Sequence, residues 1–185
     1  MPVTYLRDRD IVEGIINGEN AAFESLVEVY GDRTLRVCYL ILRDLQAAED
    51  AVQETFIQVY RNISKFHGNS SLYTWIYKIA VNKCRDFLRK DMQYPSIDGT
   101  DIKCEVDIEN EVIEKLDREK IKSLVFSMPA IYREVITLFY FEDMPIKDIC
   151  SILDEGEGTV KSKLHRARNL LKKTLAEEGI QYGKG

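Results

Sequence analysis

A concentrated group of positive charges lies at residues 158–173, "GTVKSKLHRARNLLKK", a segment with six lysines and arginines and no acidic residue. Ammonium and guanidinium groups bind phosphate oxygens, and guanidinium groups also read guanine edges in the DNA major groove. The chain as a whole is acidic, with a formal net charge of −5. The segment is therefore a candidate for nucleic-acid binding, and a solvated charged helix surface is the alternative interpretation.

The same segment has the periodicity of an amphipathic helix. At 100° per residue, its apolar side chains fall in a stripe about 80° wide, formed by Val160, Leu164, Ala167, Leu171 and Leu175. We expect this stripe to pack against a core, which leaves every lysine and arginine of the segment except Lys163 on the exposed side.

Residues 145–173 have the layout of a helix–turn–helix. Pro145 starts the first helix, "DEGEG" forms the turn and Thr159 begins the second helix. The second helix of this motif lies in the major groove, with its first residues at base edges and later cations at phosphates. The candidates for base contact are Thr159, Lys161, Ser162, His165 and Arg166, and those for phosphate contact are Arg168, Lys172 and Lys173.

A second polar stripe lies within residues 71–90, "SLYTWIYKIAVNKCRDFLRK". Its members fall in an arc of about 80° and are Thr74, Lys78, Asn82, Arg85 and Arg89. Trp75 stands at the edge of this stripe, next to the polar loop at 67–71. A cationic stripe beside an aromatic ring suits single-stranded nucleic acid, because bases stack on aromatic side chains. The alternative is that Tyr73, Trp75 and Tyr77 are core aromatics.

Catalytic signatures are missing from the sequence. Glu49, Asp50 and Glu54 cluster on one expected helix, but helical di-metal sites need Glu-x-x-His pairs, and neither His67 nor His165 stands three residues after a glutamate. There is no nucleophile elbow, P-loop or dinucleotide glycine motif. The four cysteines form no C-x-x-C pair and lack zinc-ligand spacing. We expect no enzyme activity, cofactor, metal or small-molecule substrate.

The elements that position these stripes are expected to be helices throughout. Long stretches show three-and-four spacing of apolar residues, with only four prolines among 185 residues. Asp8 is expected to cap a helix ended by Gly18, and Asn20 and Asp44 to cap the next two. In the second half, helices are expected at 111–128 and 130–142. The longest apolar run is too short to span a bilayer, which favours a cytoplasmic protein.

Charge divides the chain into two domains. Residues 94–117 contain two basic and eight acidic groups and open with turn formers, which is typical of a linker that runs into the next helix. We expect helical domains at 1–93 and 113–185, joined by a flexible acidic linker at 94–112. In the free protein this linker is hypothesised to lie against the basic helix and compete with DNA.

Three segments, in this order and at these separations, resemble one family: "AEDAVQETFIQVYRNISKF", "SLYTWIYKIAVNKCRDFLRK" and "GTVKSKLHRARNLL". The whole chain is similar to alternative RNA polymerase sigma factors of the extracytoplasmic-function (ECF) group in the sigma-70 family. The resemblance implies a region 2 helical bundle that binds core polymerase and opens the minus-10 element, and a region 4 helix–turn–helix that reads the minus-35 element. It also implies an anti-sigma factor, often membrane-anchored.

The resemblance assigns roles to particular residues. Core-polymerase contacts fall on Asp50, Gln53, Glu54 and Phe56, although a surface acid cluster over a core Phe56 is the alternative. Minus-10 contacts fall on Asn69, Ser70, Tyr73, Thr74, Trp75, Lys78, Asn82, Arg85 and Arg89. Minus-35 contacts fall on Thr159, Lys161, Ser162, His165, Arg166, Arg168 and Lys172. The turn departs from the family, with Gly156 where relatives often have Pro or Ser and with acids at Glu155 and Glu157.

Two other functions fit part of the sequence. A helix–turn–helix regulator would bind specific duplex DNA without polymerase, as a dimer on a palindromic site. A helical protein-binding adaptor would leave the basic stripe of residues 158–173 without a role.

Overall fold

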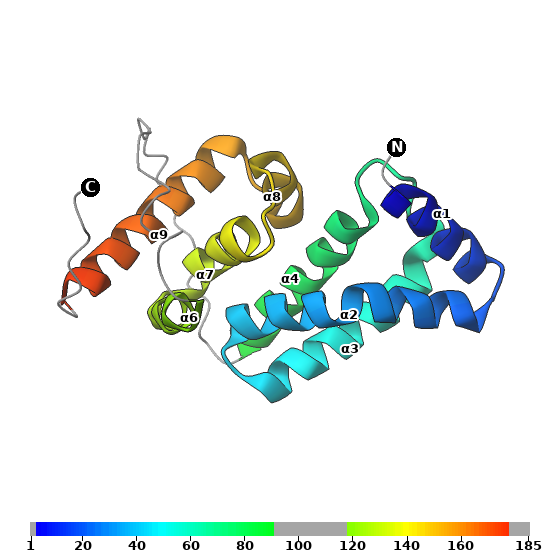
Figure 1. Cartoon of the computed structure of the whole chain (residues 1–185), viewed down its shortest axis with the longest axis horizontal. Helices are drawn as coiled ribbons and strands as arrows, with labels where there is room; N and C mark the ends of the chain where they lie inside the picture. Colours follow the sequence, from blue (N-terminus) through cyan, green and yellow to red (C-terminus); the bar gives the residue numbers. More distant parts are fainter. Residues whose placement is uncertain (1–2, 91–117, 178–185) are drawn as a thin grey trace. The chain divides into compact units, whose positions relative to one another are not determined.

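A computed structural model describes residues 3–90 and 118–177, and its regular elements in these ranges are all helical. The all-α fold class is confirmed. The chain divides into two compact units, Met1–Lys90 and Asp91–Gly185, drawn in blue to green and in yellow-green to red in Figure 1. The expected linker at 94–112, and its hypothesised contact with the basic helix, lie outside the described residues.

The first unit is a bundle of four helices: α1 (Val3–Ile16), α2 (Asn20–Leu42), α3 (Leu45–Asn62) and α4 (Leu72–Lys90), with a 3₁₀ turn, η1 (Ile63–Lys65), after α3. Helix α2 contacts the other three helices, and α3 also contacts α4 (Figure 1). Leu26, Ile41 and Ile76 are fully buried at the centre. This packing fixes which face of α3 and α4 can meet a partner.

The helix starts of the first unit confirm one expectation and correct two. The Asp44 carboxylate accepts a hydrogen bond from the Ala47 amide at 2.7 Å and caps α3, as expected. Asp8 is no cap, because α1 begins at Val3 and Asp8 instead accepts a hydrogen bond from the Tyr30 hydroxyl of α2. Asn20 is the first residue of α2, and Glu19 occupies the cap position without a side-chain bond.

The second unit contains α6 (Arg118–Ser127), α7 (Ala130–Ile136), the π-helical turn η2 (Thr137–Phe141), α8 (Ile146–Leu153) and α9 (Glu157–Glu177). Helix α9 contacts α6, α7 and α8 (Figure 1). The apolar stripe expected to face the core is buried at every position, Val160, Leu164, Ala167, Leu171 and Leu175. The outer side of α9 is thereby fixed.

One expected boundary in the second unit was wrong, and one expected helix is not α-helical along its whole length. Helix α9 begins at Glu157, two residues before Thr159, because Asp154 takes a left-handed conformation (φ 60°) that ends α8 and shortens the turn. The helix expected at 130–142 changes to π-helical hydrogen bonding at Thr137, a change that apolar periodicity does not reveal.

Candidate nucleic-acid interface

The outer side of α9 presents most of the expected contact residues. Lys161 and Lys173 are exposed. The half-buried members of the set are Thr159, Ser162, His165, Arg166, Arg168 and Lys172. Lys163 is buried, as its place outside the basic stripe implied. Cationic side chains therefore line the side of the helix opposite the apolar stripe.

The two acids of the helix–turn–helix turn face different ways. Glu155 forms an ion pair with Lys163 at 2.5 Å, and the two side chains are only 15% and 7% exposed. This pair ties the turn to α9 from the inside. Glu157 pairs with Lys161 at 2.6 Å on the surface. The hydrogen bond and positive charge of Lys161 lower the pKa of Glu157, so at neutral pH Glu157 engages a candidate base-reading side chain.

Arg168 joins α9 to the π-helical turn. Its Nε donates a hydrogen bond to the Tyr140 hydroxyl at 2.7 Å. Its guanidinium also lies over the rings of Phe139 and Tyr140, 5.4 and 5.6 Å from the centroids. Arg168 therefore holds the helix in place, in addition to any phosphate contact expected of it.

Burial corrects the polar stripe of α4. Thr74 and Arg85 are 2% and 9% exposed and are not surface residues. Both lie at the edge of the 80° arc nearest to the packed side of α4. The Thr74 hydroxyl also lies 2.7 Å from that of Ser71. Asn82 is exposed and Lys78 is half-buried, so these residues belong to the surface that remains.

Aromatic rings flank the loop that precedes α4. Trp75 is half-buried and lies against Phe66, with ring centroids 5.4 Å apart. Tyr73 packs edge-on against Tyr77 at 6.0 Å. Tyr77 is a core residue, as the alternative interpretation held, while Tyr73 and Trp75 reach the surface. This surface, together with the loop, contains three exposed residues, Asn69, Asn82 and Arg89, and four half-buried ones, Ser70, Tyr73, Trp75 and Lys78.

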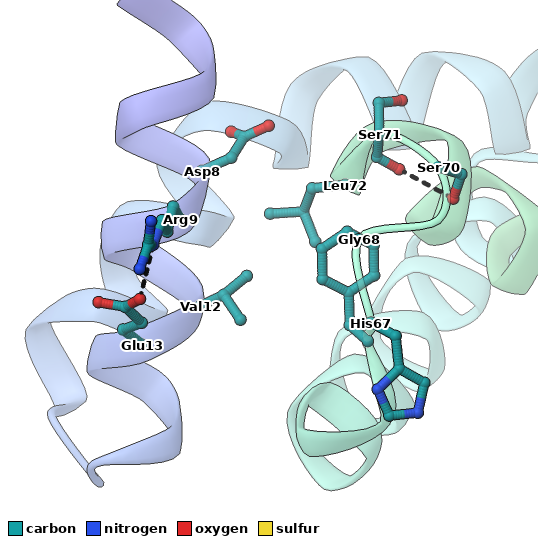
Figure 2. Close-up of a pocket in the computed structure, with 10 residues that line it drawn as sticks. Asp8, Arg9, Val12, Glu13, His67, Gly68, Ser70, Ser71 and Leu72 are labelled. Carbon is teal, nitrogen blue, oxygen red and sulfur yellow. Dashed lines mark hydrogen bonds and ion pairs between the residues drawn. The ribbon is translucent and has the colours of Figure 1, made fainter.

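A pocket of about 450 Å³ lies between this loop and α1. Figure 2 shows Asp8 and Val12 pointing from α1 toward the loop, and Leu72 pointing back toward α1. The loop side is completed by Phe66, His67, Gly68, Ser70 and Ser71, with Gly68 in the left-handed region (φ 72°). This wall is not visible in the sequence, where Asp8 has the residue type of a helix cap.

Three of the four residues expected to contact core polymerase lie on the exposed face of α3, and one is buried. Asp50, Gln53 and Glu54 are exposed, with Glu54 paired to Lys83 of α4 at 3.0 Å. Phe56 is only 5% exposed and packs in the core beneath the acids, as the alternative interpretation held, and it is not part of the exposed face.

Two large apolar side chains occupy the exposed face of α3 instead. Ile57 and Tyr60 are 50% and 48% exposed, and helical spacing places them on the same face as Gln53. Both residues could have been identified from the sequence. If Ala48, Ala51 and Val59 mark the core side of the helix, 100° spacing places Ile57 on the opposite side and Tyr60 next to it.

Other kinds of site find no support in the part of the chain that the structure describes. No group of three or more His, Cys, Asp or Glu side chains there could hold a metal ion. None of the described helices is long and apolar enough to cross a bilayer.

Comparison with known proteins supports the two-region reading. Residues 26–93 match the family model for sigma-70 region 2, and residues 118–171 match that for sigma-70 region 4. The chain is 31% identical to the ECF RNA polymerase sigma factor SigW of Bacillus subtilis over 90% of this chain and 95% of the relative. It is 32% identical to the RNA polymerase sigma-H factor of Pseudomonas aeruginosa over 94% and 96%.

Solved structures share the fold. CnrH, in complex with the cytosolic domain of CnrY, matches 92% of this chain and 98% of its own with a TM-score of 0.68 at 21% identity. The sigma factor RpoE of Bartonella quintana, in complex with the anti-sigma factor NepR, matches 83% and 96% with a TM-score of 0.63 at 23% identity. With both regions in order and relatives matched along nearly their full length, the chain belongs to the ECF group of the sigma-70 family of RNA polymerase sigma factors.

Proposed function

We propose that this chain is an alternative sigma factor that binds core RNA polymerase in the cytoplasm and directs it to promoters, without a chemical step of its own. Domain 1–93 acts at the minus-10 element and domain 113–185 at the minus-35 element. The observation that supports this most is the presence of both sigma regions in one chain, matched over 95% of the length of a sigma factor relative. Linking two weak DNA contacts raises the effective concentration of the second.

The minus-35 element is read by the outer side of α9. Lys161 is exposed near the start of the helix, where a recognition helix meets base edges, and His165 and Arg166 lie on the following turn. Ser162 and Thr159 add hydroxyl groups on the same outer side. Lys172 and Lys173, two turns further on, contact phosphates and fix the register of the helix.

The minus-10 strand is bound by the surface of α4 and its preceding loop. Asn82, Lys78 and Arg89 supply polar and cationic groups, and Tyr73 and Trp75 supply rings for base stacking. Thr74 and Arg85 act from the interior, where they support the loop and the helix.

Core polymerase docks on the exposed face of α3. Asp50, Gln53 and Glu54 form its polar part, and Ile57 and Tyr60 supply apolar anchors. An anti-sigma factor, which a membrane anchor would hold at the bilayer, blocks such surfaces in the free protein. The solved complexes of CnrH with CnrY and of RpoE with NepR support a partner of this kind.

Transcription in vitro tests the proposal. Bacterial core polymerase and a genomic promoter library are incubated with or without the chain, and transcript starts are mapped. New starts that require the chain are expected. Replacing Arg166 with Ala is expected to reduce the amount of transcript from these starts about tenfold, because one good base contact is worth about 1–3 kcal/mol. If the chain instead binds specific duplex DNA as a dimer and has no effect on core polymerase, the alternative function, a helix–turn–helix regulator, is favoured.

The surface pair Glu157–Lys161 is expected to restrain minus-35 binding. Glu157→Gln should raise affinity for minus-35 duplex several-fold and steepen its salt dependence, because Lys161 is released to reach the DNA and a negative charge beside the duplex is removed. The lowered pKa of Glu157 means that the pair is lost only when the pH falls through that lowered value. The wild type should therefore remain restrained between pH 6 and 8.

A matched control for this pair lies on α1, outside the helix–turn–helix. Glu13 pairs with Arg9 with the same i,i+4 spacing, at 2.7 Å on the surface. Glu13→Gln removes the same charge away from the minus-35 duplex. Fluorescence anisotropy with holoenzyme over a salt series compares the two variants, and equal gains from both would rule out a specific restraint by Glu157.

A further inference from the structure

The contact between Arg168 and the turn η2 lies on the same side of α9 as the base-reading turn. On a helical wheel, Arg168 falls within about 20° of Lys161, an exposed residue of that turn. A rise of about 1.5 Å per residue places Arg168 about 10 Å further along the axis. Because the major groove is about 12 Å wide, a helix whose start meets base edges brings such a position to the phosphates at the groove edge.

Aromatic rings hold the Arg168 guanidinium in one orientation. It lies over the rings of Phe139 and Tyr140, 5.4 and 5.6 Å from their centroids. All three side chains are half-buried and therefore still reach solvent. A planar guanidinium that is stacked before it binds loses less rotamer freedom when it forms hydrogen bonds. Arg168 is thus prearranged for an anion at the groove edge.

The hydrogen bond between Arg168 and Tyr140 brings N–H and O–H donors side by side. Arg168 Nε donates to the Tyr140 hydroxyl oxygen at 2.7 Å. A guanidinium has five N–H donors, and this bond uses one of them. A hydroxyl that accepts a hydrogen bond still has its own proton to donate. A phosphate group only accepts hydrogen bonds, so it matches both donors at once.

We propose that Tyr140 is a DNA-binding residue, and that its hydroxyl and Arg168 together hold one phosphate at the edge of the minus-35 duplex. The turn η2 thereby contacts the DNA from outside the recognition helix. Arg168 supplies the charge, and Tyr140 supplies a neutral hydrogen bond whose direction fixes the register of α9 in the groove. The inference rests on the proposed function at the minus-35 element and adds a residue and an element to it.

The test measures binding of holoenzyme to a duplex that carries only the minus-35 element, by fluorescence anisotropy over a salt series. Tyr140→Phe keeps the ring that Arg168 lies over and removes only the hydroxyl. Affinity should fall about fivefold, because a hydrogen bond to a charged acceptor is lost. The slope of log affinity against log salt should not change, because no charge is lost. Arg168→Gln should lower that slope by about one.

A methylphosphonate scan locates the contact. Each phosphate of the duplex is replaced in turn by an uncharged methylphosphonate. At one position, the loss caused by Tyr140→Phe should shrink from about fivefold to less than about twofold, because the acceptor has been altered. Equal losses at every position would mean that the hydroxyl supports the fold and touches no phosphate, which overturns the inference.

A double variant separates a direct contact from a positioning role. If the Tyr140 hydroxyl binds the phosphate itself, Tyr140→Phe should still weaken binding at least about twofold when Arg168 is already replaced by Gln. If Tyr140→Phe then has no further effect, Tyr140 acts only through Arg168 and the inference is overturned.

Tyr39→Phe is the matched control, because Tyr39 is a half-buried tyrosine of α2 in the first unit, which has no proposed contact with this duplex. It removes the same hydroxyl and should leave affinity unchanged. A loss equal to that of Tyr140→Phe would overturn the inference, and so would normal binding by Tyr140→Phe. If the wild-type holoenzyme does not bind the minus-35 duplex at all, the proposed minus-35 function itself fails.

Discussion

Ile57→Asp is expected to weaken binding of the chain to core RNA polymerase at least about 30-fold. Central apolar anchors of an interface typically cost about 2 kcal/mol or more when removed, and the aspartate adds a charge that must be desolvated. Ile57 is 50% exposed in the free protein, so its replacement should have little effect on folding. Titration of labelled protein with core enzyme measures the affinity.

Ile16→Asp provides the control. Ile16 is 54% exposed and is the last residue of α1, a different helix from the one proposed to dock. It has the same residue type, nearly the same exposure and the same new charge. Binding of this variant should stay within about twofold of the wild type. An equal loss in both variants would show that a charge anywhere on the first unit is harmful and that α3 is not the docking face.

Glu155→Ala is expected to destabilise the second unit by about 3 kcal/mol, because it leaves the Lys163 ammonium buried without its carboxylate. A loss of this size is a large part of the total stability of a small domain, about 5–15 kcal/mol. The double variant Glu155→Leu with Lys163→Met removes both charges and should regain most of the loss.

The single tryptophan allows the two units to be followed separately during urea unfolding. Trp75 lies in the first unit, so its fluorescence reports that unit, while far-UV circular dichroism reports both. In Glu155→Ala, the urea midpoint of the fluorescence transition, which reports the first unit, should not move. The part of the dichroism transition that reports the second unit should shift to lower urea. Glu157→Ala, which breaks an exposed pair two residues away, should shift it far less. Equal shifts would mean that the buried pair has no special role.

Periodicity and residue type were sufficient to predict the helical architecture and the core side of α9. All five residues of the apolar stripe that includes Leu164 and Leu171 are buried, because 3.6-residue spacing alone determines which side of a helix can be covered. The Asp44 cap was likewise visible, since it is a local interaction between neighbours in sequence.

Contacts between distant residues were not visible in the same way. Arg85 appeared to be a surface cation, yet α4 is enclosed by α2 and α3 on more sides than its own polarity indicates. The Asp8 carboxylate does not cap a helix because it accepts a hydrogen bond from Tyr30, 22 positions away in the sequence. The Glu155–Lys163 pair depends on a left-handed residue, Asp154, which gives little local signal when it is not glycine.

The clamp of Arg168 onto Tyr140 and Phe139 has a consequence for engineering. Together with the buried stripe, it fixes the axis and rotation of α9 by contacts that involve neither Lys161 nor Arg166 of the base-reading turn. The base-reading residues of α9 can therefore be replaced by those of another recognition helix while the contacts that position α9 stay unchanged. This unit is a suitable scaffold for building mutually independent transcription switches in synthetic circuits.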